Sequence, residues 1–99
     1  MHHKIHKIIS FQILGPYRLL VTFADGLEQD IDFLPVLHGS LYGPLKELHL
    51  FNSVKIDPEV HTLVWPNGAD FDPATLHDWL TEGPILCKQA EEWSAKQHI

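Results

Sequence analysis

The sequence predicts an α+β fold: an antiparallel three-stranded meander, a short helix, a β-hairpin and then two C-terminal helices packed on the sheet. Two patterns indicate this order. Apolar and polar residues alternate with a period of two through the first third of the chain, which is typical of strands. In the last third, apolar residues recur at helical spacing. The length of 99 residues fits a single domain.

The first strand is predicted over residues 4–14 and is expected to end at Gly15-Pro16. Its apolar residues stand at odd positions, and they are Ile5, Ile9, Phe11 and Ile13. Because side chains alternate between the two faces of a strand, these four are expected on one face.

Two further strands are predicted on either side of Ala24-Asp25-Gly26, over residues 17–23 and 27–33. A two-residue turn would set apolar residues of one strand against acidic residues of the other. A three-residue loop with a left-handed glycine instead pairs Leu19 with Ile31 and keeps the apolar side chains on one face. A slip of one residue exchanges the two faces, so the apolar pattern favours the three-residue loop.

A short helix and a second hairpin are predicted in the middle of the chain. The helix is expected to start at Gly43-Pro44, because a proline in the first helical turn loses no hydrogen bond. Residues 54–57 and 61–65 are expected to pair as a hairpin that turns at Pro58-Glu59.

Two helices are predicted in the last third of the chain. Asp72 is placed to cap a helix that starts at the next residue, a proline. Gly83-Pro84 is expected to stop this helix, and a final helix is expected over residues 85–97. We therefore expect one α+β domain over residues 1–83, to which residues 84–99 add a C-terminal helix of the same domain.

Composition narrows the classes of function. Thirteen Asp and Glu residues against seven Lys and Arg give a net charge of -6, which argues against direct nucleic-acid binding and against binding to anionic membranes. A single cysteine excludes an intramolecular disulfide and a cysteine-based structural zinc site. No apolar run has the length of a membrane span and no signal peptide is visible, so we expect a cytoplasmic protein.

The most distinctive local pattern is the segment Trp65, Pro66, Asn67, Gly68, Ala69 and Asp70, which Asp72 follows closely. Four more motifs precede it in order: Asp25-Gly26, Leu34-Pro35, Gly43 to Leu48, and Phe51 to Ile56. This series resembles, over residues 4–79, the bacterial domain of unknown function 2442 family. The resemblance implies a small α+β domain and brings no known activity, cofactor or catalytic residue. Members are similar to proteins encoded beside another small uncharacterised family, which implies an antitoxin-like role in a pair.

The polar residues of this signature, Asn67, Asp70 and Asp72, have two interpretations. Their oxygens could bind a hard cation such as calcium or magnesium. Alternatively they are structural, with an Asn-Gly turn, an Asp70 side chain that bonds nearby backbone, and a capping Asp72. The structural interpretation is favoured, because the calcium-loop pattern is absent and these residue types mark turns for mechanical reasons. We expect no metal, no cofactor and no catalytic residue.

The eight histidines show no spacing that predicts a zinc site. His2, His3 and His6 lie near the amino group of Met1, and His3 could chelate copper or nickel together with that amino group. Whether His2 and His3 are native residues stays open. The others are scattered singly: His38, His49, His61, His77 and His98. His77 and Asp78 are not expected to form a catalytic pair by adjacency, because neighbouring residues on a helix do not face each other. Whether any histidine meets Asp70 or Asp72 stays open.

Two surfaces are candidates for a partner interface. One is the exposed face of the first hairpin, with Glu28, Asp30 and Asp32. The other involves Trp79 and Trp93, which either cover the core or form an interface, since tryptophan is enriched at binding hot spots. Cys87 is expected to be an ordinary helix residue, because nearby acidic residues oppose thiolate formation.

The leading functional hypothesis is a non-enzymatic protein-interaction module, the acidic, antitoxin-like partner of a small basic protein, or a homo-oligomer. An acidic surface would steer a basic partner and raise its association rate. The alternatives are a transcriptional regulator, for which a basic helix is missing, and a small metal-binding or enzymatic protein.

Overall fold

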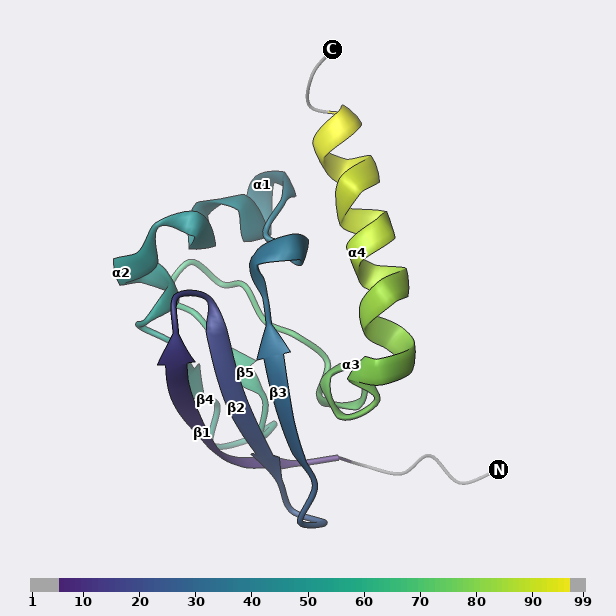
Figure 1. Cartoon of the computed structure of the whole chain (residues 1–99). Helices are drawn as coiled ribbons and strands as arrows, with labels where there is room; N and C mark the ends of the chain where they lie inside the picture. The colour runs from purple at the N-terminus through teal and green to yellow at the C-terminus, as the bar shows by residue number, and fades with distance from the viewer. Residues whose placement is uncertain (1–5, 97–99) are drawn as a thin grey trace.

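The strands form two antiparallel sheets within residues 6–96, the part of the chain that this computed structural model describes (Figure 1). The three-stranded sheet has the order β1-β2-β3 and consists of β1 (Ile8–Gly15), β2 (Arg18–Phe23) and β3 (Glu28–Asp32). The two-stranded sheet consists of β4 (Lys55–Ile56) and β5 (Leu63–Val64). The α+β class, the meander and the second hairpin predicted from the sequence are confirmed.

The three-residue loop between β2 and β3 is also confirmed. Leu19 stands opposite Ile31, as the apolar pattern predicts. Gly26 has a φ of 92°, a left-handed conformation that glycine adopts without a steric penalty. Its N–H donates to the carbonyl of Phe23 at 2.9 Å and closes the loop. This loop keeps the apolar side chains of both strands on the core face.

The predicted face of the first strand is wrong at its beginning. A bulge between Ile8 and Ser10 inserts Ile9 as an extra residue, and the Ile9 side chain is 59 % exposed. Ile8 takes the core position instead and pairs with Phe23. A bulge moves every earlier residue to the other face, which alternation alone does not reveal. Ile5 lies outside the described residues.

The segment between β3 and β4 contains four short helical turns in place of the single predicted helix. They are η1 (Leu34–Val36), α1 (Gly39–Tyr42), η2 (Gly43–Lys46) and α2 (Leu48–Phe51). The helical pattern that starts at Gly43-Pro44 breaks at Glu47, whose backbone is extended at φ -72° and ψ 111°. The Glu47 side chain accepts the N–H of Leu50 and so starts a new turn as its cap.

The last third contains α3 (Pro73–His77) and α4 (Trp79–Lys96). Asp72 caps α3 as predicted, since its carboxylate accepts the N–H of Ala74. The predicted stop at Gly83-Pro84 is wrong, because α4 continues through both residues, and the chain leaves the helical conformation at Asp78 instead. Gly83 serves packing: a Cβ at this position would lie 2.8 Å from Cε2 of the Trp79 ring.

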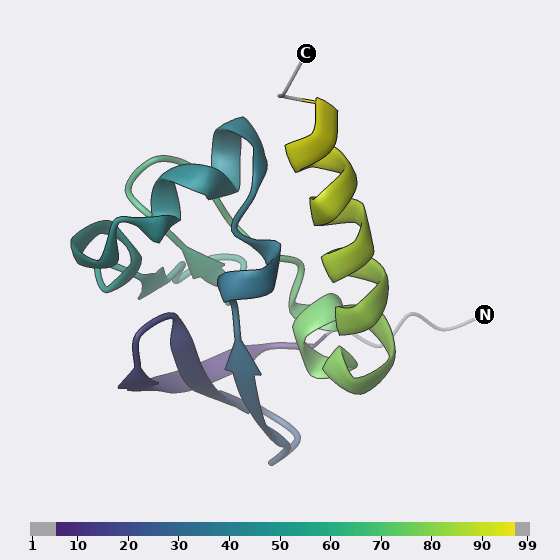
Figure 2. The same ribbon diagram turned by 45° about the horizontal axis from the view of Figure 1, so that its top comes forward.

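Helix α4 stands beside the β3 edge of the larger sheet, next to η1 and α1 (Figure 2). It therefore closes one flank of the core. The core is built around aromatic rings, and Phe33 contacts the rings of Phe51, Trp65 and Phe71 at centroid distances of 5.8, 6.1 and 5.2 Å. Ala90, fully buried, brings α4 against this core.

Candidate functional site

The signature segment forms a turn that is anchored to the core. Trp65 is buried, and its indole N–H donates to the carbonyl of Phe51 at 2.8 Å. The backbone of Trp65 accepts from Gly68 at 3.0 Å and donates to Ala69 at 2.9 Å. Gly68 has a φ of 89°, the left-handed conformation that the Asn-Gly turn requires and that glycine adopts without a steric penalty.

The polar atoms of the signature bond to neighbouring backbone. The Asn67 amide donates to the carbonyl of Leu41 at 3.0 Å, and its oxygen accepts the N–H of Ala69 at 3.1 Å. The backbone carbonyl of Asp70 accepts the Tyr42 hydroxyl at 2.7 Å. Burial and the nearby charge of Asp70 raise the pKa of the Tyr42 hydroxyl. These contacts support a structural role for the signature.

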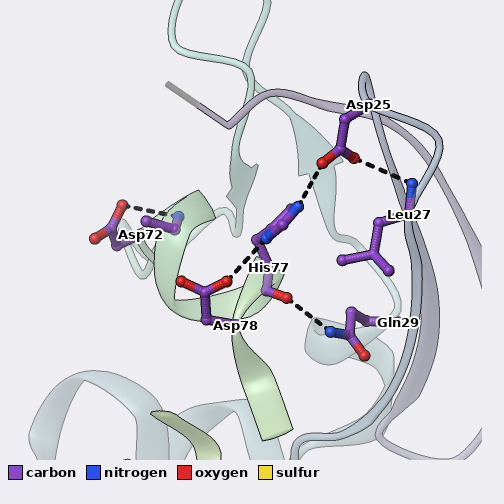
Figure 3. Close-up of polar contacts among 7 residues, drawn as sticks. Asp25, Leu27, Gln29, Asp72, His77 and Asp78 are labelled. Carbon is purple, nitrogen blue, oxygen red and sulfur yellow. Dashed lines mark hydrogen bonds and ion pairs between the residues drawn. The ribbon is translucent and has the colours of Figure 1, made fainter. Parts of the chain in front are cut away.

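The structure instead brings a histidine between two carboxylates (Figure 3). His77 Nδ1 lies 2.9 Å from Asp78 Oδ1, and His77 Nε2 lies 2.7 Å from Asp25 Oδ2. The premise that the His77 and Asp78 side chains do not face each other is wrong, because Asp78 is not helical: its φ of -98° and ψ of 34° interrupt the helical conformation between α3 and α4. No histidine meets Asp70 or Asp72 in a cluster of three potential metal ligands among the described residues.

The two carboxylates come from different parts of the fold. Asp25 lies in the β2–β3 loop, where its second oxygen, Oδ1, accepts the N–H of Leu27 at 3.1 Å. The next strand adds a further contact, because Gln29 Nε2 donates to the backbone carbonyl of His77 at 2.7 Å (Figure 3). The β2–β3 hairpin is therefore fastened to the end of α3 by two polar contacts to one histidine, from Asp25 and from Gln29.

A second histidine completes this group, which we call the His77 cluster (His6, Asp25, His77 and Asp78). The rings of His6 and His77 stack with their centroids 3.7 Å apart and an interplanar angle of 18°. Phe23 presents to His77 in an edge arrangement at 4.9 Å. The His77 side chain is 14 % exposed. One ligand atom each from His6, His77 and Asp78 lies within 4.8 Å of the others, close enough to share a metal ion.

Within the cluster, His77 and Asp25 each favour the charged form of the other. The hydrogen bond to Asp78 and the bond and charge of Asp25 raise the pKa of His77, although burial opposes this. The bond from His77, with the N–H of Leu27, lowers the pKa of Asp25. In the protonated form both ring nitrogens of His77 donate to carboxylates, so the ring holds no free lone pair with which to act as a general base.

A groove of about 390 Å³ lies beside the His77 cluster. It is lined by Leu27, Gln29, His77, Asp78, Leu80, Thr81 and Glu82. A molecule of solvent size or a small ligand can therefore reach the cluster from this side.

The predicted acidic surface on the first hairpin is partly neutralised. Arg18 donates to both oxygens of Asp30, at 2.8 and 2.5 Å, and this contact lowers the pKa of Asp30. Thr22 donates to Glu28 at 3.3 Å. Asp32 accepts the N–H of Leu34 through one oxygen. Asp32 is therefore exposed, and within the described residues no basic side chain forms an ion pair with its carboxylate.

A second groove of about 390 Å³ lies between this surface and α4, and we call it the α4 groove. Its lining consists of Asp30, Asp32, Pro35, Trp79, Leu80, Gly83, Pro84 and Cys87. Of the predicted interface residues, the structure thus brings Asp30, Asp32 and Trp79 together. Glu28 does not line this groove. Trp93 also lies elsewhere, because its ring stacks on Tyr42 near α1 at 6.0 Å.

The remaining predicted candidates are separate. His38, His49 and His61 lie in the segments before α1, in α2 and before β5, and none of them belongs to the His77 cluster. Burial, followed by the charges of Glu91 and Asp32, raises the pKa of the Cys87 thiol. A thiol held in its neutral form is a poor nucleophile. His2, His3 and His98 lie outside the described residues.

Sequence reasoning missed the His77 cluster because Asp25 and His77 are 52 positions apart. The available signals were the Asp-Gly loop and an unexplained His-Asp pair, and neither indicates the other. In the part of the chain that the structure describes, no helix combines the length and the apolar character needed to cross a membrane.

The comparisons with known proteins identify one family. The model of the family described as "Protein of unknown function (DUF2442)" matches residues 8–82, which is most of the chain. The match contains both sheets, α3 and the start of α4, and the rest of α4 extends beyond it. No curated protein and no solved structure matches the chain. The chain belongs to the DUF2442 family of proteins of unknown function.

Proposed function

We propose that this protein is a non-enzymatic interaction module that binds a small basic protein in the bacterial cytoplasm, in the manner of an antitoxin. The observation that supports this most is the α4 groove, where acidic and apolar side chains meet. Asp30 and Asp32 lie on one side of the groove, and Trp79 and Leu80 on the other. Such a surface fits a partner segment that carries basic and apolar residues together.

The apolar side of the groove supplies candidate anchors. The Leu80 side chain, which lines the groove, is 87 % exposed. Trp79 is held in place by contact with Phe33 and Gly83, so it offers its remaining surface in a fixed position. Rigid aromatic residues with apolar neighbours are typical of the residues that dominate binding energy at interfaces. An exposed leucine costs little by itself, but Leu80 adjoins Trp79 in the groove, and such a group of apolar side chains indicates an interaction surface.

The charge of the chain supports a basic partner. A net charge of -6 attracts a positively charged protein over the range of the Debye length and raises its association rate. Asp32 lies at the groove and has no basic side chain bound to it within the described residues. An arginine or lysine of the partner would therefore meet a carboxylate that is available for pairing.

The chemistry of the reactive side chains supports a role without catalysis. Both nitrogens of His77 are engaged by carboxylates, and the pKa of the Cys87 thiol is raised. Neither group is prepared to act as a base or a nucleophile in this arrangement.

Co-expression with the product of the neighbouring open reading frame tests this proposal. We expect a complex that co-purifies, weakens as the salt concentration rises, and suppresses any toxicity of the partner. Leu80→Glu and Asp32→Asn should each weaken the complex at least tenfold. Absence of a complex together with unchanged toxicity would contradict the proposal.

Two matched variants serve as controls. Val60→Glu introduces the same charge at another exposed apolar residue, in the β4–β5 loop and away from the groove. Glu59→Gln removes a charge beside it, as Asp32→Asn does in the groove. Both controls should leave the affinity within twofold of the original. Equal losses in the controls would show that overall charge, and not the α4 groove, determines binding.

A further inference from the structure

We propose that His6, His77 and Asp78 bind a divalent transition-metal ion of the zinc type. This site is distinct from the proposed protein-binding groove. One ligand atom from each of the three residues lies within 4.8 Å of the other two. Two imidazoles and one carboxylate form a ligand set that proteins use for zinc, and it leaves a fourth position open.

The His77-Asp78 pair already has the spacing that a tetrahedral ion requires. Zinc binds imidazole nitrogen and carboxylate oxygen at about 2.0–2.1 Å, so two ligands at tetrahedral angles stand roughly 3.3 Å apart. His77 Nδ1 and Asp78 Oδ1 are 2.9 Å apart. An opening of a few tenths of an ångström therefore accommodates the ion between them, once Nδ1 has lost its proton.

Asp25 supplies the support that metal-binding histidines typically have. Its carboxylate holds the other ring nitrogen of His77, Nε2, at 2.7 Å, and the N–H of Leu27 fixes the second carboxylate oxygen. An acidic residue that accepts the second N–H of a histidine orients the ring toward the metal and makes the ring a better donor. With Nε2–H bound to Asp25, the lone pair of a neutral His77 lies on Nδ1, beside Asp78. We assign Asp25 as a positioning residue.

His6 requires one movement to join the site. Its ring stacks on His77 at 3.7 Å and 18°, so the lone pairs of the two rings lie in nearly parallel planes. They can converge on one ion only when the His6 ring rotates about its side-chain bonds. His6 precedes β1 and is only partly buried, so the rotation requires no rearrangement of the core. The groove beside His77 and Asp78 gives water or a small ligand access to the fourth position.

The chemistry of the ligands determines the class of ion. Imidazole nitrogen suits zinc, copper and nickel, whereas calcium and magnesium prefer sites built from oxygen alone. Zinc is the useful probe because copper and nickel could also bind at the chain start, through the amino group of Met1 and His3.

The test is a calorimetric titration of the full chain with zinc chloride, after treatment with a chelator. We expect one zinc ion per chain. His6→Gln and Asp78→Asn should each lower the affinity at least tenfold, and Asp25→Asn should lower it about 10- to 100-fold. His38→Gln and His49→Gln are the matched controls, and both should bind like the original chain. Circular dichroism of each variant establishes that it is folded.

Two further measurements distinguish this site from the chain start and identify the metal-bound nitrogen of His77. A chain with both His2→Gln and His3→Gln should bind zinc normally; loss of binding in this variant would assign the metal to the chain start and overturn the proposal. Nitrogen-15 NMR should show His77 metal-bound at Nδ1 and protonated at Nε2, the tautomer that Asp25 favours. Absence of zinc binding, or equal binding by the original chain, His6→Gln and Asp78→Asn, would also overturn the proposal.

Discussion

At the scale of single residues, the buried hydroxyl of Thr62 is satisfied by a contact with another segment of the chain. Thr62 is buried, and its hydroxyl donates to the carbonyl of Phe71, which joins the β4–β5 hairpin to the segment before α3. Among the described residues, no buried side-chain nitrogen or oxygen lacks a partner. A buried carbonyl that loses its hydrogen-bond donor is still removed from water and has no partner in exchange. Loss of the donor therefore costs more free energy than the small net contribution of a typical hydrogen bond.

Thr62→Val tests this cost with almost no change in volume. The substitution leaves the carbonyl of Phe71 without the hydroxyl donor, and we expect the free energy of unfolding to fall by about 1–3 kcal/mol. Urea denaturation measures the change. Thr22→Val is the matched control, since Thr22 is only partly buried and its partner Glu28 is exposed, so the same exchange should cost less than about 0.5 kcal/mol. Similar losses in both variants would contradict the argument.

At the scale of elements, α4 contains two residues that usually end a helix, and they have opposite roles. Gly83 makes room for the Trp79 ring, and a Cβ there would also lie 3.0 Å from Cδ2 of that ring. Pro84 lies within the helix and has no N–H to give to the carbonyl one turn earlier. The pair predicts a helix end from sequence, but the glycine is explained by packing and the proline is tolerated inside the helix.

Substitution by alanine at these adjacent positions should therefore change stability in opposite directions. Gly83→Ala improves helix propensity by about 1 kcal/mol, yet the clash with Trp79 should outweigh this gain and give a net loss of about 1–2 kcal/mol. Pro84→Ala restores a backbone hydrogen bond and should stabilise the protein by up to about 3 kcal/mol. Thermal denaturation of the two variants compares them directly. A stabilising Gly83→Ala would show that the Trp79 ring moves away at little cost.

At the scale of the whole molecule, the predictable features are those that a few neighbouring residues determine. The Gly26 loop and the Asp72 cap were predicted because the turn residue, the cap and the adjacent apolar pattern lie within a short segment. The bulge at Ile9 and the continuity of α4 were not predicted, since each depends on which surface the rest of the chain presents. Local patterns predict whether a segment forms a helix or a strand, whereas tertiary packing decides which of its faces is buried and where it ends.

The same difference of scale explains which features of the candidate sites can be predicted from the sequence. Glu28, Asp30 and Asp32 can be placed on one hairpin face from alternation alone, but the pairing of Arg18 with Asp30 requires side-chain positions. The His77 cluster draws on the chain before β1, the β2–β3 loop and the end of α3. Its members have no common spacing, so only the folded arrangement reveals them.

Helix α4 extends beyond the family match, which ends at residue 82. The remainder of the helix contributes Ala90, which is fully buried, and Trp93, which stacks on Tyr42. A chain shortened to residues 1–82 would expose the core beside η1 and α1, and we expect it to lose cooperative thermal unfolding, because small domains have little stability to spare. Leu80→Ser in the full chain is the control for lost apolar surface, since Leu80 is 87 % exposed and its replacement should change stability by less than about 0.5 kcal/mol. Cooperative unfolding of the shortened chain at the original temperature would show that the family domain is complete without the rest of α4.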